Sequence, residues 1–496
     1  MKLKYLLIIP FFCTAFTSNI VKGQRIKEFK NNIEKAAHIT PSDRQLRWQQ
    51  LELTAFIHFG VNTFTEREWG DGNESPQVFN PDSLDARQWV SVCKEAGIKQ
   101  VILTAKHHDG FCLWPTKTTT HSVKSSPWKN GSGDVVKELA AACKEYGLGF
   151  GVYVSPWDRN SPVYGDPKYN DLFVEQLTEL LTQYGQIDEV WFDGANGEGP
   201  NGKKQVYDFP RWYSLIRKLQ PKAVIAVMGP DVRWVGTETG YGRATEWSVV
   251  PTNKTSLESI AENSQQNEIL KPEINQMADD IGSREKIKDA EGLVWYPAET
   301  DVSIRPGWFY HKKDDDKVKS PEKLLDIYYH SVGRNSVLLL NIPPDKRGLI
   351  HENDVKNLKE WNRLIKGTFA HNLMQNAKIS SANGKNTKAL TDQKYKTHWT
   401  TKGTDTTATM EINLRNKETF DVFSIQENIS VGQRIEGFVL EYKDGQDWKK
   451  ITEGTTVGFK RLLRFPAITA ENLRLRILSS RLNPTIAEMG IYKSIK

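Results

Sequence analysis

The sequence predicts an α/β fold in which a (β/α)8-like barrel is followed by a second domain, an all-β sandwich. Between residues 40 and 366, short apolar strands alternate with amphipathic helices, which is the pattern of a barrel of parallel strands. Beyond Thr368, short alternating stretches are separated by turn residues at intervals typical of a β-sandwich. We therefore divide the chain into a signal peptide at 1–23, a barrel at 24–367 and a sandwich at 368–496.

The first residues have the composition of a signal peptide. A positively charged start at 1–4 precedes the apolar stretch Tyr5–Phe16, which is too short to span a bilayer, and small residues precede Gln24. We therefore expect export to the periplasm, the cell surface or the medium. Cys13 raises the alternative of a lipid anchor, but the bulky Phe12 stands where a small residue is wanted. No other segment is apolar enough to be a membrane span.

The barrel elements alternate in order along the chain. Strands are expected at Thr54–Phe59, Gln100–Ala105, Gly149–Val154, Ile187–Asp193, Ala223–Val227, Leu293–Tyr296 and Val337–Ile342. Helices are expected at Asp85–Ala96, Val135–Tyr146, Lys168–Tyr184, Pro210–Leu219, Pro321–Val332 and Val355–Ile365. Thr40-Pro41-Ser42 is a helix start with Pro at the first helical position. The polar stretch Asn253–Asp289 is typical of a surface insertion over the barrel.

In the second domain, the alternating stretches predict short strands. They lie at Thr409–Leu414, Phe420–Gln426, Arg434–Tyr442, Trp448–Glu453, Leu473–Leu478 and Ile486–Tyr492.

Composition excludes some functions. The formal charge of +6 is mild for 496 residues, and no basic stripe is present, so nucleic acid is not an expected partner. Three cysteines follow the signal peptide, Cys93, Cys112 and Cys143, and an odd number cannot pair fully within one chain. Free thiols are expected, with one disulfide as the alternative. The chain has no CxxC motif, which argues against a structural zinc site.

Polar and aromatic side chains follow most of the predicted strands, at the end where parallel barrels carry their chemistry. Trp191-Phe192-Asp193-Gly194 closes an apolar strand and places an aspartate directly before a glycine. A second carboxylate, Glu238, follows Trp234 in a glycine-rich loop. Two carboxylates in a pocket rich in His and aromatic residues favour glycoside hydrolysis, in which one carboxyl is ionised and the other protonated.

Each of these residues also has a structural interpretation. Asp193 could cap a helix, and Glu238 could be a solvated loop residue. His58 could be a buried core histidine. His107-His108-Asp109 could bind a metal ion, but neighbouring residues at a strand end point to opposite sides, and no third ligand has a diagnostic spacing. Three tryptophans in loops could either fill the core or stack on sugar rings: Trp69, Trp234 and Trp308.

At these residues the barrel resembles the α-L-fucosidases of glycoside hydrolase family 29. The resemblance covers residues 44–366 and rests on the following motifs: Phe56-Ile57-His58-Phe59-Gly60, Ala105-Lys106-His107-His108-Asp109-Gly110-Phe111, Trp191-Phe192-Asp193-Gly194 and Arg305-Pro306-Gly307-Trp308-Phe309-Tyr310. It implies a retaining enzyme that removes terminal α-L-fucose, with Asp193 as the nucleophile and no metal or organic cofactor. It also implies that the fucose hydroxyls are bound by His58, Glu68, Trp69, His107, His108 and Tyr153. Trp191 and Trp308 would contact the sugar ring and its methyl group.

The acid/base residue varies in position within that family. The segment Asp-Val-Arg-Trp-Val-Gly-Thr-Glu, which ends at Glu238, resembles the subgroup acting on branched α-1,3/4-linked fucose, as in Lewis-type glycans. The resemblance implies that Glu238 is the acid/base and that Trp234 lines the pocket. Two other candidates stay open, Glu299 and Glu246, the latter on an expected sixth strand.

The second domain resembles discoidin-like sandwiches and family-32 carbohydrate-binding modules. Ala389-Leu390-Thr391-Asp392, Thr397-His398-Trp399 and Asn483-Pro484-Thr485-Ile486-Ala487-Glu488 carry this resemblance. Sugar-binding residues in such modules lie on variable loops, so the domain could be a lectin or a structural appendage. For the whole protein, two alternatives remain: a broad fucosidase acting on α-1,2 and aryl fucosides, and a fucose-binding protein with an inactive barrel.

Overall fold

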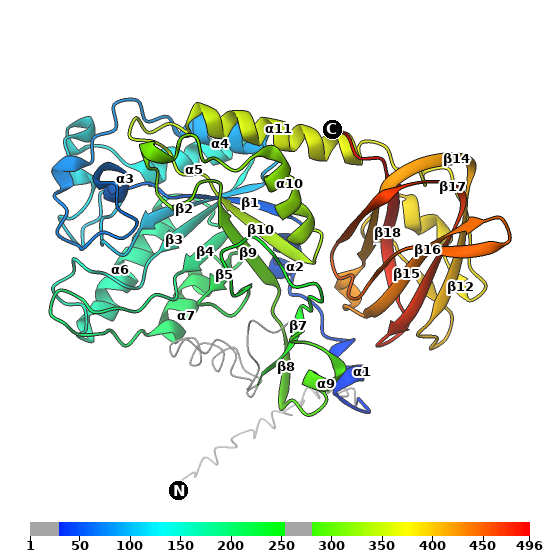
Figure 1. Ribbon diagram of the computed structural model, residues 1–496. Coiled ribbons are helices and arrows are strands. Elements are labelled where there is room, and N and C mark those ends of the chain that lie inside the picture. Colours follow the sequence, from blue (N-terminus) through cyan, green and yellow to red (C-terminus); the bar gives the residue numbers. More distant parts are fainter. Residues whose placement is uncertain (1–28, 253–279) are drawn as a thin grey trace, which may run out of the picture.

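The protein consists of a barrel and a sandwich that lie side by side (Figure 1). The computed structural model describes residues 29–252 and 280–496. The predicted signal peptide at 1–23 and most of the predicted insertion at Asn253–Asp289 lie outside the described residues. The predicted fold class is confirmed, because a nearly closed parallel barrel is followed by an antiparallel sandwich.

The barrel is a sheet of eight parallel strands in the order β5-β4-β3-β2-β1-β10-β9-β6. A single bridge between Ala226 and Val232 brings the two edge strands together. The strands are β1 Leu53–Ile57, β2 Gln100–Lys106, β3 Gly149–Val154, β4 Glu189–Phe192, β5 Val224–Val227, β6 Arg233–Trp234, β9 Ala298–Ser303 and β10 Ser336–Asn341. Strands β1, β2 and β4 are buried along their whole length because helices cover the outer face of the sheet.

The helices begin where polar side chains cap their free N–H groups. Asp85 and Asp134 cap α4 and α5, and Asp208 caps α7 ahead of its proline. The barrel helices are α4 Ala86–Glu95, α5 Val135–Tyr146, α6 Lys168–Gln183, α7 Phe209–Leu219, α10 Pro321–His330 and α11 Glu352–Phe369. Shorter helices are α1 Asn32–Ala36, α2 Asp43–Gln49, α3 Val61–Thr65 and α9 Arg284–Ile287.

Two details near the helix and strand ends differ from the expectation. Helix α2 begins at Asp43, because Ser42 and Gln45 form a capping box that leaves Pro41 outside the helix. The apolar stretch predicted as a barrel strand at Leu293–Tyr296 is β8 Gly292–Trp295, which pairs antiparallel with β7 Val249–Thr252 outside the barrel.

The barrel position expected for that stretch belongs to β9, whose sequence is polar. Glu299, Asp301 and Ser303 alternate along β9, and each hydrogen-bonds a residue of the candidate site described below. Side chains two apart in a strand share one face, so these three line the same side. A hydrophobic pattern could not reveal this strand, since its buried face is polar.

The second domain is an antiparallel sandwich with its own apolar core around Leu390, Trp399 and Phe423. Its strands are β11 Lys378–Ser380, β12 Gly384–Lys385, β13 Trp399–Thr401, β14 Ala408–Glu427, β15 Ile435–Asp444, β16 Asp447–Gly454, β17 Arg461–Ser480 and β18 Thr485–Tyr492. Two predicted strands, Thr409–Leu414 and Phe420–Gln426, are parts of β14, which continues through an irregular register opposite β17.

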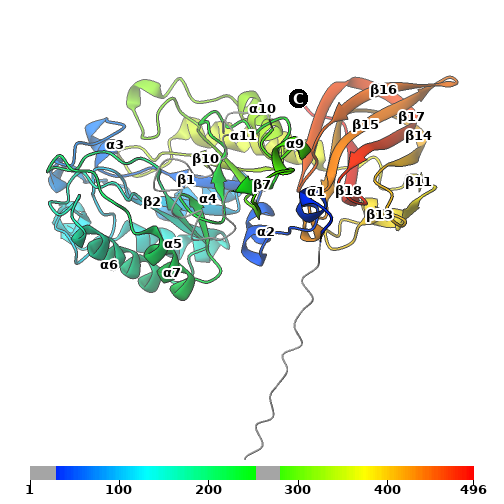
Figure 2. The same cartoon turned by 90° about the horizontal axis from the view of Figure 1, so that it is seen from below.

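A third apolar cluster joins the two domains. It contains residues of α1, α9, the β7-β8 pair and the sandwich, among them Ala36, Trp295 and Phe459. Seen from below, α1 and α9 lie between the barrel and the sandwich (Figure 2). The domains are therefore connected by a packed interface as well as by the chain.

The structure also shows the state of the cysteines and whether a described helix could span a membrane. Cys93, Cys112 and Cys143 are free and buried, as expected, and burial raises the pKa of Cys93 to about 12. Among residues 29–252 and 280–496, no helix is long and apolar enough to cross a membrane.

Candidate active site

Asp193 follows the last residue of β4, at the carboxyl end of the barrel. Its Oδ2 accepts a hydrogen bond from the Tyr153 hydroxyl at 2.9 Å, and its Oδ1 accepts one from the Ala195 N–H at 2.7 Å. About a quarter of its side chain is exposed. The carboxylate is thus aimed by two donors and remains open on one side, as a nucleophile requires.

Aromatic and imidazole rings from four neighbouring strands form one wall beside Asp193. Tyr153 of β3 stacks on His107, with ring centres 5.7 Å apart, and on Trp191 of β4 at 5.2 Å. His107 also lies 4.2 Å from His108 and 5.8 Å from His58. The barrel therefore brings these five predicted binding residues together.

The hydrogen-bond network fixes the proton position on His58. Asn341 at the end of β10 uses its Nδ2 group to donate to Ser303 Oγ at 2.9 Å and to the Trp308 carbonyl at 2.7 Å. Its Oδ1 is left to accept from His58 Nδ1 at 2.8 Å. Burial lowers the pKa of His58 to about 3, so its ring is neutral. The proton is on Nδ1, and Nε2 is an acceptor.

His108 has the same tautomer for a similar reason. The Ser155 hydroxyl donates to the Trp157 carbonyl at 2.7 Å, so Ser155 Oγ accepts from His108 Nδ1 at 2.7 Å. Burial lowers the pKa of His108, which keeps this ring neutral. Its Nε2, 3.8 Å from Asp193 Oδ2, is consequently an acceptor beside the carboxylate.

Trp308 connects this wall to two glutamates. Its ring centre lies 5.2 Å from that of His58, and its backbone N–H donates to Glu68 Oε2 at 2.7 Å. Glu68 also contacts His311 Nε2 at 2.6 Å. Gly307 permits this approach, because a Cβ at that position would lie 2.3 Å from Glu68 Oε1. The indole Nε1 of Trp308 reaches Glu238 Oε2 at 3.4 Å.

Glu238 lies on the exposed loop after β6, and Trp308 contacts both Glu238 and His58. Trp234 of β6 is half-buried and donates from Nε1 to Asp301 Oδ1 at 2.8 Å. Burial raises the pKa of Asp301 well above its ordinary value. The structure thus places Trp234 beside β9, with its indole bonded to Asp301.

Trp69 covers the outer side of the ring wall. Its ring centre is 5.3 Å from His108 and 5.6 Å from Trp157, both edge-on, and the side chain is 55% exposed. An exposed indole beside buried imidazoles is a surface on which an apolar sugar face can pack.

The other two acid/base candidates are buried away from this opening. Glu299 of β9 is fully buried and accepts from Trp191 Nε1 at 2.7 Å. It faces Glu189, and burial raises the pKa of both carboxyls. Glu246 is fully buried and bonded to the Arg233 guanidinium, and it lies before β7 instead of on a sixth barrel strand. Neither carboxyl reaches solvent, so Glu238 fits the acid/base role best.

Several residues of the site were given no role in the predictions from the sequence. Asn341, Ser155 and Phe309 hold or contact the three histidines, and Asp301 holds Trp234. Asn341 is the last residue of an apolar strand, and Asp193 directly follows one, so this position was the available signal. Asp301 belongs to the alternating polar residues of β9.

The His107-His108-Asp109 motif is used for packing and hydrogen bonding. Asp109 accepts from Asn62 Nδ2 at 3.0 Å and from the Phe111 N–H at 2.7 Å, and its Oδ2 lies 3.9 Å from His107 Nδ1. Burial raises its pKa to about 7. Within the described ranges, no group of three or more His, Cys, Asp or Glu side chains is arranged to hold a metal ion.

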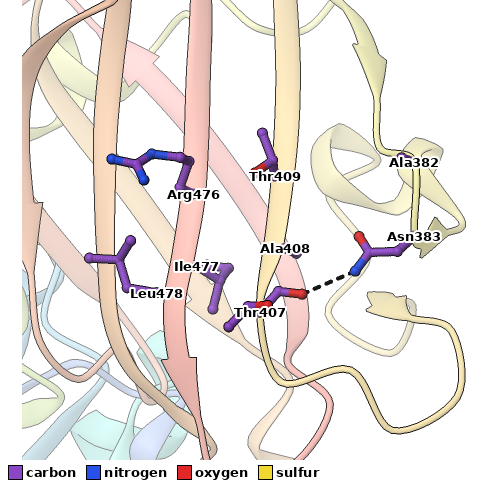
Figure 3. Close-up of a pocket in the computed structure, with 8 residues that line it drawn as sticks. All are labelled: Ala382, Asn383, Thr407, Ala408, Thr409, Arg476, Ile477 and Leu478. Carbon is purple, nitrogen blue, oxygen red and sulfur yellow. Dashed lines mark hydrogen bonds between the residues drawn. The ribbon is translucent and has the colours of Figure 1, made fainter.

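The sandwich carries a shallow depression between β14, β17 and the loop that precedes β12 (Figure 3). Asn383 Nδ2 donates to the Thr407 carbonyl at one side of it, and Leu478 is 48% exposed at another. The lining has no aromatic ring on which a sugar could stack: Ala382, Asn383, Thr407, Ala408, Thr409, Arg476, Ile477 and Leu478.

Comparison with known proteins places both domains. A family model described as Alpha-L-fucosidase matches residues 45–367, and one described as F5/8 type C domain matches residues 375–489. Alpha-L-fucosidase 1 of Arabidopsis thaliana is 44% identical over 464 residues, covering 91% of this chain and 87% of the relative. Among solved structures, a glycoside hydrolase 29 fucosidase of Ruminococcus gnavus in complex with fucose is similar, with a TM-score of 0.81 and 32% identity, covering 92% of this chain and 96% of its own. A glycoside hydrolase 29 family member from an unknown rumen bacterium has a TM-score of 0.77 and 41% identity, covering 92% and 78%.

Proposed function

The chain belongs to the alpha-L-fucosidase family, glycoside hydrolase family 29, and we propose that it releases terminal fucose from α-1,3 and α-1,4 linkages of branched glycans. The observation that carries the proposal is the Asp193 carboxylate, aimed by Tyr153 and bordered by neutral imidazoles. Glu238, which accepts from the Trp308 indole, supplies the second carboxyl that a retaining glycosidase needs.

The reaction then proceeds by two displacements at the anomeric carbon. Asp193 attacks this carbon while the glycosidic bond breaks and Glu238 gives its proton to the departing oxygen. In the second step Glu238 takes a proton from water as the water oxygen displaces Asp193. Both carboxyls return to their starting states, and the anomeric configuration is retained.

The ring wall supplies the contacts to fucose. Because His58 and His108 hold their protons on Nδ1, each offers Nε2 as an acceptor for a sugar hydroxyl. His107, Glu68 and Trp69 add further polar and aromatic contacts around the sugar. Trp191 and Trp308 are the apolar surfaces for the ring and its C5 methyl group.

The preference for branched linkages rests on the surroundings of Glu238. Glu238 is exposed on the loop after β6, whereas the histidines of the wall are buried. A leaving group protonated there lies at the rim of the site, where a branched sugar has space, and Trp234 stands on the adjoining strand. Broad activity on α-1,2 and aryl fucosides is the alternative.

We also propose that the protein is exported. The charged and apolar composition of residues 1–23 supports this proposal. N-terminal sequencing of the mature protein from the periplasm or medium should begin at Gln24. A mature protein that keeps its first residues in the cytosol would contradict it.

One experiment tests both the reaction and the linkage. Fucose release is measured from a Lewis trisaccharide, a 2′-fucosylated lactose and an aryl fucoside, for the native enzyme and for Asp193→Asn. We expect release mainly from the Lewis trisaccharide, and a loss on the order of 10⁴-fold or more in the variant, which keeps its fold because the change is isosteric.

The other outcomes separate the alternatives. Equal or faster release from the other two substrates would replace the linkage preference by the broad activity. Release that persists in Asp193→Asn would contradict the role of Asp193.

A further inference from the structure

The segment 243–248 directly follows the loop that carries Glu238, and the sandwich domain holds it. The Ala244 carbonyl accepts from Arg461 Nη1 at 2.6 Å and from Thr455 Oγ1 at 3.1 Å. The Glu246 N–H donates to Thr456 Oγ1 at 3.0 Å. These donors and acceptors lie at the turn before β17 and at the start of that strand, so they belong to the other domain.

A buried glutamine of the sandwich completes this attachment. Gln433 is fully buried; its Nε2 donates to the Glu246 carbonyl at 3.0 Å, and its Oε1 accepts from the Ser248 N–H at 2.8 Å. One side chain therefore pairs with a backbone donor and a backbone acceptor of the barrel segment, much as a neighbouring strand would.

The held segment is connected to the site through a buried ion pair. The Glu246 carboxylate binds the Arg233 guanidinium, and Arg243 Nη1 lies 3.3 Å from the same carboxylate. Arg233 also donates to the carbonyls of Tyr296 and Trp247, at 2.9 and 3.1 Å. Arg233 immediately precedes Trp234 in β6, so the anchored segment and the start of the Glu238 loop are joined at this residue.

The sandwich fixes its own contact loops with another buried carboxyl. Glu427 Oε1 accepts from the N–H groups of Arg434 and Ile435, at 2.8 and 2.9 Å, next to Gln433. Its Oε2 accepts from the Gly458 N–H at 2.8 Å, two residues after Thr456. The Glu427 side chain thus holds together the two loops of the sandwich that contact the barrel, the one with Gln433 and the one with Thr456.

Gly458 of the sandwich packs directly against Asn335 of the barrel. Its φ is +63°, and a Cβ there would lie 2.2 Å from Asn335 Cγ. Asn335 accepts from the Phe459 N–H at 2.7 Å and donates to the Glu246 carbonyl at 3.2 Å. The same barrel asparagine therefore binds both the sandwich turn and the held segment.

We propose that the sandwich domain positions the acid/base loop, with Gln433 and Thr456 as its positioning residues. The proposal rests on the proposed role of Glu238 and adds that the second domain is a working part of the active site. Loss of these contacts allows the loop to move, and small displacements of a catalytic group are costly. The loss should be confined to substrates whose departing oxygen requires a proton.

The test compares two substrates in five variants. For Gln433→Ala, kcat/KM on a fucosylated oligosaccharide should fall about tenfold or more, while kcat/KM on an activated chloronitrophenyl fucoside, which needs little protonation, should change less than about threefold. Thr456→Val should show the same split, meaning a large loss of kcat/KM on the oligosaccharide and a small one on the aryl fucoside. Thr456→Ser, which keeps the hydroxyl, should have native values on both substrates. Thermal unfolding verifies that each variant is folded.

Lys460→Met is the matched control. Lys460 forms an interdomain ion pair with Glu52, ahead of β1 and so at the opposite end of the barrel from the site. Its loss should lower stability without separating the two substrates.

Each outcome has one meaning. Equal losses on both substrates, or no loss, in the folded Gln433 and Thr456 variants would overturn the positioning role. Glu238→Ala is measured alongside, because absence of the split in that variant would overturn the role of Glu238 and this proposal with it. A split in Glu238→Ala without one in Gln433→Ala would overturn this proposal alone.

Discussion

The two sides of the site are built differently. On the side of β1–β4, His58, His108 and Asp193 are each held by partners within the barrel, and the two imidazoles are buried. On the side of β6, the strand has only two residues and Glu238 lies on an exposed loop. The segment that follows this loop is held by side chains of the sandwich.

Under the roles proposed for Asp193 and Glu238, the two chemical steps depend on different parts of the chain. Attack on the anomeric carbon would rely on groups that the barrel alone arranges. Proton transfer to the departing oxygen would rely on a loop supported from outside the barrel. Substitutions on the first side should therefore affect all substrates, and substitutions on the second should depend on the leaving group.

The largest effect within this comparison is expected for Glu238→Ala. Loss of a general acid costs on the order of 10²- to 10⁴-fold, and we expect this loss on an oligosaccharide substrate. An activated aryl fucoside should still form the covalent intermediate, and added azide should partly restore turnover because it needs no general base. Native turnover of the oligosaccharide would require another acid/base residue.

An intermediate effect is expected for Tyr153→Phe. The variant loses the hydrogen bond to Asp193 Oδ2, and a hydrogen bond to a charged group contributes about 1.5–3 kcal/mol. This corresponds to a loss on the order of ten- to a hundredfold in kcat/KM, and the loss should be equal for oligosaccharide and aryl fucoside.

Tyr164→Phe is the control for that variant. The Tyr164 hydroxyl bonds to Tyr207 at 2.6 Å and to Asn196 and Gly197 at 3.2 and 3.3 Å, whereas the Asp193 carboxylate is bonded by Tyr153 and Ala195. Removal of the Tyr164 hydroxyl should therefore change activity much less than the loss of the Tyr153 hydroxyl. A substrate-dependent loss in Tyr153→Phe would remove the distinction between the two sides.

The smallest effect concerns the pH dependence of stability in the supporting domain. Burial raises the pKa of Glu427 to about 7 from an ordinary value of 4.5. The pKa of Glu427 is higher in the folded state than in the unfolded state, so its protonated form stabilises the fold. This contribution to the free energy of unfolding is complete below about pH 4.5 and is lost as the pH rises through about 7. Glu427→Gln lowers Tm by setting an NH2 group against backbone donors, but it does not titrate.

Thermal unfolding between pH 5 and 8 measures this effect. The Tm difference between the native enzyme and Glu427→Gln should shrink by a few degrees as the pH rises. A difference that stays constant or grows would show that Glu427 is ionised throughout this range.

The sequence predicts the residues on the β1–β4 side of the site well and those on the β6 side poorly. The strands before His58, His107 and Asp193 are apolar runs, so their ends could be located and the polar groups after them recognised. β9 was missed because Glu299 and Asp301 occupy its buried face. Contacts between distant segments, such as Gln433 with Glu246, leave no local pattern.

The hydrogen-bond partners of the histidines illustrate the same limit. Asn341 and Ser155 determine which nitrogen of His58 and His108 carries the proton. Nothing near either histidine in the sequence indicates these partners, because they arrive from other strands. The residue types of the site could be predicted, whereas their protonation required the network.

The glycine at the domain contact restricts how this protein can be shortened or recombined. Gly458 has a left-handed backbone and no room for a side chain beside Asn335. A sandwich grafted from another protein would need a glycine here and a glutamine at the place of Gln433 to engage the barrel. A shortened chain ending at α11 would lose both. The two domains should therefore be inherited and engineered as one unit instead of as exchangeable modules.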